Sequence, residues 1–472
     1  MRKIIGRKSE ITTLLNAIKS DRPELIVVYG RRRVGKTFLI RQCLKSYIQF
    51  EFTGLHNGSL TDQLKNFRQV INEYGKKFKK PSSWLEAFNQ LRTFIDGLRS
   101  KEKKVIFIDE FPWLATNKSK FLMAFENFWN SYASQKDDLM VVICGSAASY
   151  MINNIIKNKG GLHNRMTHKI QLTPFNLYET ELLLKQKGAK LTRYDILQIY
   201  MTMGGIPHYL EKIEAGNSSA QFIDTLCFSK NGFLRTEFKN VFASLFEQHD
   251  THETIVRALA SVRRGLTRTA IIKKCKLKPG GTLSKVLVEL EESGFIEKYL
   301  PMKGIKNALY RLVDEYSLFY IQYIEKNKPA NHFWVKMHGL QTYKIWSGYS
   351  FESICIKHIE QIKKELGISG IRTVYGSWIE KGASGNAQID LLIDRDDHVI
   401  NICEIKFSNT EFTINKKYAG EIAKKVQTFI SSTKTKKSIL VTFITTYGLL
   451  TNQYKKQYVQ NELTLDDLFV DV

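Results

Sequence analysis

The sequence predicts an α/β protein built from several domains. Three apolar runs in the first third of the chain, residues 25–29, 105–108 and 139–146, end in small or acidic residues, as buried strands of a parallel sheet do. From residue 252 to 313 the pattern changes to short amphipathic helices, and apolar β-branched runs return near the carboxyl terminus. A length of 472 residues corresponds to about three domains of ordinary size.

The charge balance favours a polyanionic partner. Lys and Arg number 71 against 46 Asp and Glu, a formal charge of +25, which suits nucleic acid or an anionic membrane surface. The apolar run at residues 438–450 is too short to span a bilayer, and the amino terminus lacks the apolar core of a secretory signal. The six scattered cysteines have no metal-ligand spacing. We therefore expect a cytoplasmic protein with reduced thiols, no zinc and no membrane partner.

The most specific motif is GRRRVGKT, which follows the first apolar run and precedes an amphipathic helix. This is the context of a phosphate-binding P-loop, whose glycines let backbone N–H groups face the phosphates. Lys36 is expected to reach the β- and γ-phosphates, and the Thr37 hydroxyl to bind Mg²⁺. The predicted ATP-binding residues of this segment are Gly30, Arg31, Arg32, Arg33, Val34, Gly35, Lys36, Thr37 and Phe38.

Two further strand ends complete this predicted site. The second apolar run ends in Asp109 and Glu110. We expect Asp109 to help hold Mg²⁺ and Glu110 to polarise the water that attacks the γ-phosphate. The third run ends in Ser146, which is expected either near the γ-phosphate or as a simple cap of the next helix.

Together with these motifs, IIGRKSEITTLL at residues 4–15 and GGIPHYL at residues 204–210 resemble AAA+ and STAND ATPases. The chain is similar to the archaeal and bacterial ATPases that carry a carboxyl-terminal PD-(D/E)xK nuclease-like domain. The resemblance implies that Gly6, Arg7 and Glu10 lie on the adenine side and that GGIPHYL belongs to a helical lid. It also implies that Arg165 contacts the γ-phosphate, in the same chain or across a homo-oligomer. The alternative for Arg165 is an ordinary surface arginine.

Residues 252–313 read as three helices followed by a two-stranded hairpin, the order of a winged helix. The third helix is predicted at Thr282–Ser293. Residues 251–315 hold thirteen Lys or Arg and seven Asp or Glu, although the third helix is itself more acidic than basic. The module is therefore either a DNA-binding element or a packing element. The predicted phosphate contacts are Arg263, Arg264, Arg268, Lys273 and Lys274.

The carboxyl-terminal third contains QIDLLIDRDDHVINICEIKF, which predicts a hairpin that brings together Asp390, Glu404 and Lys406. Two carboxylates that hold Mg²⁺ beside a lysine suit phosphodiester hydrolysis, and the pattern resembles the PD-(D/E)xK core with Ile389 in place of proline. Glu352, on a preceding helix, is a further candidate metal ligand. The alternatives are a purely structural Glu–Lys pair and a nuclease fold retained as a binding module.

The predicted domains are an ATPase core at residues 1–180, a helical lid at 181–248, a winged helix at 249–315 and a nuclease-like α/β domain at 316–472. The expected function is ATP hydrolysis coupled to DNA binding, with Mg²⁺-dependent cleavage by the last domain. The alternative is a STAND-type switch in which ATP exchange changes the conformation and the last domain only binds or signals.

Overall fold

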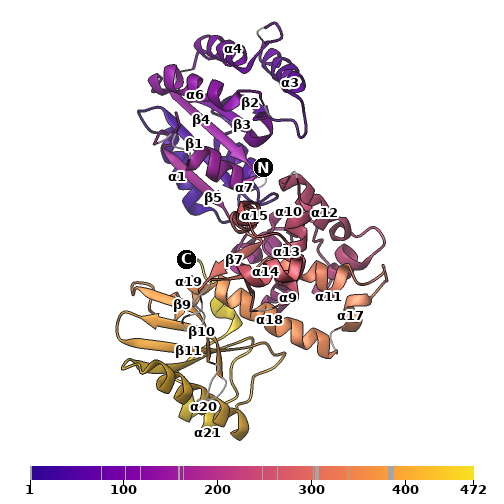
Figure 1. The fold of residues 1–472 in the computed structure, drawn as a ribbon, viewed down its shortest axis with the longest axis vertical. Coiled ribbons are helices and arrows are strands. Elements are labelled where there is room, and N and C mark those ends of the chain that lie inside the picture. Colours follow the sequence, from indigo (N-terminus) through magenta and orange to yellow (C-terminus); the bar gives the residue numbers. More distant parts are fainter. Residues whose placement is uncertain are drawn as a thin grey trace. The chain divides into compact units, whose positions relative to one another are not determined.

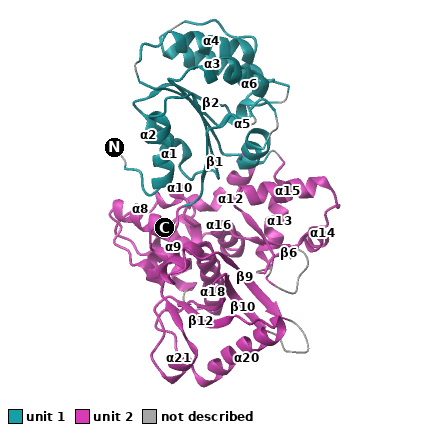
Figure 2. Cartoon of the chain, turned by 90° about the vertical axis from the view of Figure 1, so that its left-hand side faces the viewer, with its two compact units in different colours: residues 1–174, 245–247 teal, residues 175–244, 248–472 magenta. Residues whose placement is uncertain are grey.

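The computed structural model describes residues 3–75, 77–100, 102–116, 118–157, 160–162, 164–246, 248–262, 264–300, 302, 308–337, 340–380 and 387–472. The chain forms two compact units, drawn in different colours in Figure 2. Unit 1 comprises Met1–Pro174 with Leu245–Glu247, and unit 2 comprises Phe175–Ser244 with Gln248–Val472. Residues 175–180, which were predicted within the ATPase core, lie in unit 2. Unit 2 also contains the predicted lid except Leu245–Glu247, the helix–hairpin module of residues 249–315 and the predicted carboxyl-terminal domain.

Unit 1 is built on a five-stranded parallel sheet, with the strand order β2-β3-β4-β1-β5. The central strands are almost entirely buried, which explains their continuous apolar sequences. This confirms the predicted α/β class and its parallel sheet. The elements are α1 (Lys8–Ile18), β1 (Glu24–Gly30), α2 (Lys36–Leu44), β2 (Ile48–Thr53), α3 (Leu60–Glu73), α4 (Trp84–Asp96), β3 (Lys104–Asp109), α5 (Phe111–Leu114), α6 (Phe121–Ser131), η1 (Ala133–Gln135), β4 (Leu139–Gly145), α7 (Ala148–Tyr150), η2 (Met151–Ile156) and β5 (His168–Leu172).

Helices cover both faces of this sheet, with α1 and α2 on one side and α5 and α6 on the other (Figure 2). The second side has an aromatic core, in which Trp84 of α4 lies edge-on to Phe121 of α6 with ring centroids 4.8 Å apart. Because the sheet is parallel, the carboxyl ends of β1, β3 and β4 lie at one edge. That edge carries Gly30, Asp109 and Gly145.

Unit 2 begins with a helical segment that contains the GGIPHYL sequence. Gly204 has φ 65° and ends α9, and a Cβ on Gly205 would lie 1.8 Å from the carbonyl oxygen of Phe175. The Phe175 N–H also donates to the Gly205 carbonyl at 2.7 Å, so the two backbones touch and glycine is required. The elements are α8 (Leu177–Gln186), α9 (Arg193–Met203), α10 (Pro207–Leu210), α11 (Ser219–Ile223), η3 (Asp224–Phe228) and α12 (Phe233–Leu245).

The next segment contains the three helices and the hairpin predicted for residues 252–313, with an additional short strand, β6, between the first and second helices. The strands form an antiparallel sheet of order β6-β8-β7 that packs with the three helices. The third helix, α15, spans Gly281–Glu292, one residue before the predicted range at each end. The elements are α13 (Asp250–Ala260), β6 (Leu266–Thr267), α14 (Arg268–Cys275), α15, β7 (Ile296–Tyr299) and β8 (Leu309–Leu312), followed by α16 (Glu315–Phe319), η4 (Tyr320–Ile324), α17 (Phe333–Met337), α18 (Gln341–Lys357) and α19 (Ile359–Glu365).

The carboxyl-terminal part of unit 2 is a second five-stranded sheet of order β13-β12-β11-β10-β9, visible in orange and yellow in Figure 1. Strands β9 to β11 are antiparallel, and β11, β12 and β13 are parallel. Helix α20 packs on the face that carries Ile389 and Ile402, whereas α18 packs against β11. The elements are β9 (Thr373–Glu380), β10 (Ala387–Arg395), β11 (Val399–Lys406), α20 (Lys416–Thr433), β12 (Ser438–Thr445), α21 (Gln453–Tyr458), β13 (Asn461–Leu463) and η5 (Leu465–Leu468).

In the described part of the chain, every helix is too short or too polar to cross a membrane.

Candidate functional site

The predicted P-loop connects β1 to α2 at the carboxyl edge of the first sheet. Gly30 has φ 145°, and a Cβ there would lie 2.2 Å from the Leu172 carbonyl of β5, so only glycine fits. Gly35, with φ 93°, precedes the first residue of α2, and Arg33 also has a positive φ of 72°. Such a curled loop before a helix turns successive N–H groups toward one point, as an anion-binding nest does. Phe38, in the first turn of α2, is exposed.

Lys36 is 5% exposed and ties the loop to the neighbouring strand end. Its Nζ donates to the carbonyls of Gly30 and Arg31, both at 3.0 Å, and to Ser146 Oγ at 3.1 Å. These acceptors are neutral, and negative phosphate oxygens are stronger acceptors for an ammonium group. The contacts therefore hold the Lys36 ammonium group against the loop that the sequence predicts to bind phosphate.

Thr37 and Asp109 form the second contact between the loop and the sheet. Thr37 Oγ1 donates to Asp109 Oδ2 at 2.7 Å, and Asp109 is itself buried. A hydroxyl beside a single carboxylate fits Mg²⁺, because this ion keeps several water ligands and takes others from the phosphates of its nucleotide. The donor set therefore suits Mg²⁺ bound together with ATP.

Glu110 and Ser146 lie within hydrogen-bonding distance at this edge. Ser146 Oγ donates to Glu110 Oε1 at 2.8 Å, and the Ser146 N–H donates to Oε2 at 3.2 Å. Glu110 has φ 46°, a backbone region that non-glycine residues seldom occupy and that is concentrated at functional sites. Helix α7 begins at Ala148 and its first turn has no side-chain cap, so Ser146 serves the Glu110–Lys36 network instead of capping that helix.

The thiol of Cys144, on the strand that leads to Ser146, is fully buried. Burial, and then the nearby Asp109 carboxylate, raise the pKa of this thiol well above its usual range. Cys144 therefore remains protonated and contributes packing rather than chemistry.

Arg7 and Arg165 are two of the unit 1 residues that were expected at the site from resemblance alone. Arg7 is buried and donates through Nη2 to the Thr173 carbonyl at 2.6 Å, while its Nη1 lies 3.7 Å from Glu10. It thus fastens the start of α1 to the segment after β5. Arg165 is exposed in the turn before β5, and its N–H donates to the Leu162 carbonyl at 3.1 Å. In the described part of the chain, no hydrogen bond or ion pair joins the Arg165 side chain to the Lys36–Glu110 network.

In unit 2, the Glu404 carboxylate is the centre of a buried polar cluster. Glu404 is 1% exposed, and its Oε2 accepts from the Tyr418 hydroxyl at 2.6 Å. Its Oε1 accepts from Lys425 Nζ at 2.5 Å, and Lys406 Nζ lies 3.6 Å from Oε2. Glu404 and Lys406 therefore share one face of β11, as their spacing predicts.

Asp390 joins this cluster from β10. The pairing of β10 with β9 shifts between Ile389 and Leu392, a bulge that re-aims the side chains of the strand. Burial, and then the Glu404 carboxylate, raise the pKa of Asp390 above its usual value. The structure thus brings Asp390, Glu404 and Lys406 together, and Glu352 of α18 lines a cavity that Asp390 also lines.

The donor set of this cluster does not fit a divalent metal. In the described parts of the chain, no three His, Cys, Asp or Glu side chains are grouped closely enough to hold a metal ion. Both oxygens of Glu404 also accept hydrogen bonds from Tyr418 and Lys425, so a cation there would have to displace a lysine ammonium.

The sequence interpretation did not connect Tyr418 or Lys425 with Glu404. The two residues are seven apart in α20 and so lie on one helix face, which is the signal that pairs them. It also missed His358, whose ring is buried between α18 and α8.

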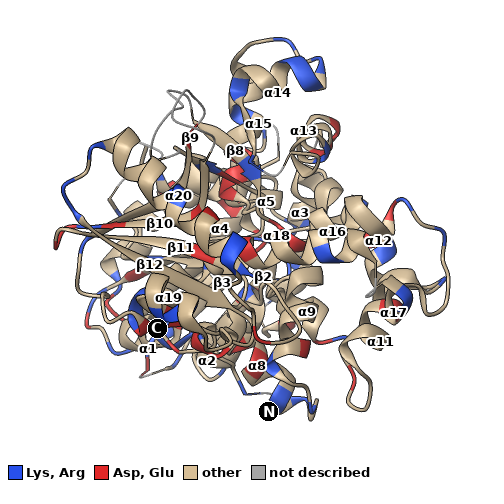
Figure 3. Cartoon of the chain, turned by 90° about the horizontal axis from the view of Figure 1, so that it is seen from below, with Lys and Arg blue, Asp and Glu red and all other residues tan. Residues whose placement is uncertain are grey.

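The predicted phosphate contacts of the helix–hairpin module have different environments. Lys273 and Lys274 are exposed on α14, where Figure 3 shows Lys and Arg gathered. Arg268 donates through Nη2 to the Gly280 carbonyl at 3.0 Å, and Arg264 contacts the side-chain amide of Gln388 in β10. Arg263 lies outside the described residues.

Comparisons with known proteins agree with the arrangement of Lys36, Thr37, Asp109 and Glu110 in unit 1. Residues 4–213 match a family model described as an ATPase domain predominantly from Archaea. This range contains the P-loop, Asp109, Glu110 and Ser146, as well as GGIPHYL. Residues 4–213 are therefore similar to an ATPase domain of this family.

Individual proteins that are similar to the chain include the following three. The uncharacterized protein MJECL04 of Methanocaldococcus jannaschii is 24% identical over 433 residues, 89% of this chain and 91% of that protein. The uncharacterized ATP-binding protein MJ0423 of the same organism is 43% identical over 42 residues, 9% of this chain and 71% of that protein. The Walker-type ATPase PABY2304 of Pyrococcus abyssi has a similar fold, with a TM-score of 0.50 and 16% identity over 68% of this chain and 96% of that one.

Proposed function

We propose that the protein hydrolyses ATP in unit 1 and couples this reaction to DNA binding by residues 250–312, which act as a winged helix. The observation that carries the proposal is the convergence of Lys36, Thr37, Asp109, Glu110 and Ser146 at one sheet edge. We also propose that the protein is cytoplasmic, because its cysteines are free thiols and its proposed substrate is ATP.

Each residue of this edge has a role in phosphoryl transfer to water. Lys36 exchanges its carbonyl partners for the β- and γ-phosphates, and Thr37 with Asp109 holds the Mg²⁺ that arrives with ATP. Glu110 accepts the proton of the attacking water. Ser146 joins Glu110 to Lys36, so the water-polarising group and the phosphate-binding group are positioned by one hydroxyl.

The experiment that tests this proposal measures phosphate release with and without duplex DNA at one fixed salt concentration. We expect DNA to increase turnover severalfold, because binding at the helix–hairpin module would stabilise the active state. Turnover that is the same with and without DNA would contradict the coupling.

A STAND-type switch is the second candidate, and one observation favours it. Both oxygens of Glu110 accept hydrogen bonds from Ser146, which holds this carboxylate in place in the described state. An enzyme that must break these contacts at each cycle turns over slowly and spends most of its time bound to ATP or ADP. A switch would show slow turnover that DNA does not change, and nucleotide exchange would alter its protease sensitivity.

For the carboxyl-terminal sheet, we propose a module that binds nucleic acid without cutting it. The support is the Glu404 cluster, in which Lys425 and Tyr418 occupy the carboxylate that a nuclease would offer to Mg²⁺. Calorimetric titration of the nucleotide-free protein with Mn²⁺, in the presence of DNA, decides between the two roles. Heat of binding that disappears in Glu404→Ala would instead support a metal-dependent nuclease with Asp390, Glu404 and Glu352 as ligands.

A further inference from the structure

Unit 2 contains a cavity of about 840 Å³ that the function proposed above leaves without an occupant. Its walls come from the end of α13, from the hairpin β7–β8, from α18, and from β9 and β10. The volume falls within the range of about 300–1,000 Å³ that is typical of small-ligand sites. A nucleic-acid duplex is far too large for it, whereas a few unpaired nucleotides are not.

Cations outnumber carboxylates around the cavity. The charged lining residues are Arg257, Arg264, Arg311, Lys326, Glu352 and Asp390. Arg311 is paired with Glu297 at 2.8 Å and Arg257 with Glu325, but Arg264 contacts the neutral amide oxygen of Gln388. Of the three arginines, Arg264 is thus the one whose described contact is uncharged, and a guanidinium in this position suits a phosphate group.

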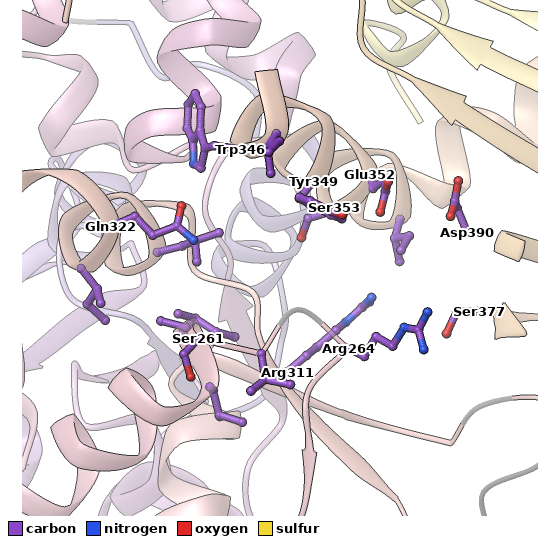
Figure 4. Close-up of a pocket in the computed structure, with 18 of the residues that line it drawn as sticks. Ser261, Arg264, Arg311, Gln322, Trp346, Tyr349, Glu352, Ser353, Ser377 and Asp390 are labelled. Carbon is purple, nitrogen blue, oxygen red and sulfur yellow. The ribbon is translucent and has the colours of Figure 1, made fainter. Parts of the chain in front are cut away.

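Aromatic residues lie along the same wall. Trp346 and Tyr349 of α18 line the cavity, and Figure 4 shows Tyr349 between Trp346 and Glu352. Trp346 is 4% exposed and packs against Phe319, Tyr323 and Trp334, so the half-buried Tyr349 supplies the accessible ring. Aromatic rings beside a cation are the elements that bind unpaired nucleotides.

Two carboxylates are the third feature of the cavity, after the cation and the aromatic residues. Glu352 and Asp390 lie at the same end of the cavity (Figure 4). Carboxylates accept hydrogen bonds from the amino groups of cytosine, adenine and guanine, and thymine has no such amino group. A ligand that satisfies all three features has phosphates, flat rings and base amino groups.

We propose that this cavity binds a short single-stranded segment of nucleic acid, with a phosphate on Arg264 and an amino-bearing base against Glu352. The inference rests on the proposed nucleic-acid function and names the form of nucleic acid that this site takes. Duplex DNA remains the partner of the helix–hairpin surface around α14. The cavity and that surface are separate sites on one unit.

The test uses the full-length protein, without nucleotide and with EDTA, and fluorescence anisotropy of labelled oligonucleotides of about ten residues. We expect oligo(dC) to bind at least about fivefold more tightly than oligo(dT), whose base is also a pyrimidine but has no amino group. Arg264→Gln should weaken oligo(dC) binding about tenfold. Glu352→Ala should reduce the preference for dC to less than about twofold.

Lys273→Gln is the matched control, because it removes one positive charge from the same module outside the cavity. It should change oligo(dC) binding less than about twofold while weakening duplex binding. Equal losses in Arg264→Gln and Lys273→Gln, or no preference between dC and dT, would overturn the inference. If duplex DNA stimulates ATP hydrolysis but single strands do not bind, the cavity inference fails alone. If neither form of DNA binds, the proposed function fails with it.

Discussion

Glu110 and Lys36 perform different tasks although one serine contacts both. Glu110→Gln keeps the size of the side chain and removes its ability to accept a proton. We expect it to bind ATP as the unaltered protein does and to lose about 10²-fold or more in turnover. Lys36→Ala should abolish ATP binding, because it removes the cation that reaches the phosphates. A fluorescent ATP analogue measures binding, and phosphate release measures turnover.

Glu51→Gln is the control for these variants, since Glu51 is a carboxylate of the same sheet that pairs with Arg41 away from the P-loop. Both binding and turnover should be unchanged in it. Full turnover in Glu110→Gln would show that another group activates the water.

The buried Asp390 side chain makes stability depend on pH. Burial and then Glu404 raise its folded-state pKa, so the unfolded chain releases this proton at lower pH than the folded chain does. The contribution of Asp390 to the free energy of unfolding is therefore fully present below its unfolded-state pKa, about 3.9. This contribution is lost as the pH rises through the folded-state pKa of Asp390. Asp390→Asn should stabilise the protein at neutral pH, and the gain should vanish in acid. Urea titrations of both proteins over this range would show it; a variant less stable at neutral pH would contradict it.

At the scale of elements, His358 links the end of α18 to the start of α8. Its Nε2 accepts from the Leu177 N–H at 3.0 Å, and its Nδ1 lies 2.8 Å from the Ile354 carbonyl. These partners require the neutral ring with its proton on Nδ1. Burial lowers the pKa of His358 to about 4.

The folded-state pKa of this base is depressed, so the unfolded chain takes up the proton first as pH falls. Stability is fully present above about pH 6.5 and decreases down to about pH 4, by on the order of 3 kcal/mol. His358→Gln should be less stable than the unaltered protein near neutral pH and should lack this part of the acid sensitivity. Parallel urea titrations at several pH values measure the difference. An identical pH dependence in both proteins would mean that His358 is not neutral in the folded state.

The elements that sequence predicts well are those set by local chemistry. The strands that lead to Gly30 and Asp109 are continuous apolar runs, and their parallel arrangement follows from the loop and helix between them. The contacts of Glu404 are harder to predict from the sequence. Tyr418 and Lys425 reach Glu404 only because helix α20 crosses over the sheet. Likewise, nothing near His358 in the chain indicates that its partner is Leu177, 181 residues away. Pairings of this kind depend on tertiary packing, which spacing does not encode.

At the scale of the whole molecule, the exposed position of Arg165 leads us to expect that ATP turnover depends on association between copies of the chain. This arginine is exposed, and if it completes the site of a neighbouring copy, Arg165→Ala alone should be inactive. Mixing it with Lys36→Ala should restore about one quarter of the normal rate in a dimer, because half of the pairs then contain one complete site. Arg99→Ala, another exposed arginine of unit 1, serves as control and should be active alone. A mixture that stays inactive would place Arg165 within its own chain or outside catalysis.

With a net charge of +25, the protein is expected to bind duplex DNA with an affinity that depends on salt. If Arg268, Lys273 and Lys274 contact phosphates, three counterions are released and affinity falls with a log–log slope of about −2.7. Raising salt from about 50 to 200 mM should then weaken binding about 40-fold. Lys273→Gln should reduce the slope by about one, because one phosphate contact is lost. Lys19→Gln, an equal charge change at an exposed residue just after α1 of unit 1, should leave the slope unchanged. Equal effects of the two substitutions would mean that the overall charge of the chain, rather than the α14 surface, attracts the DNA.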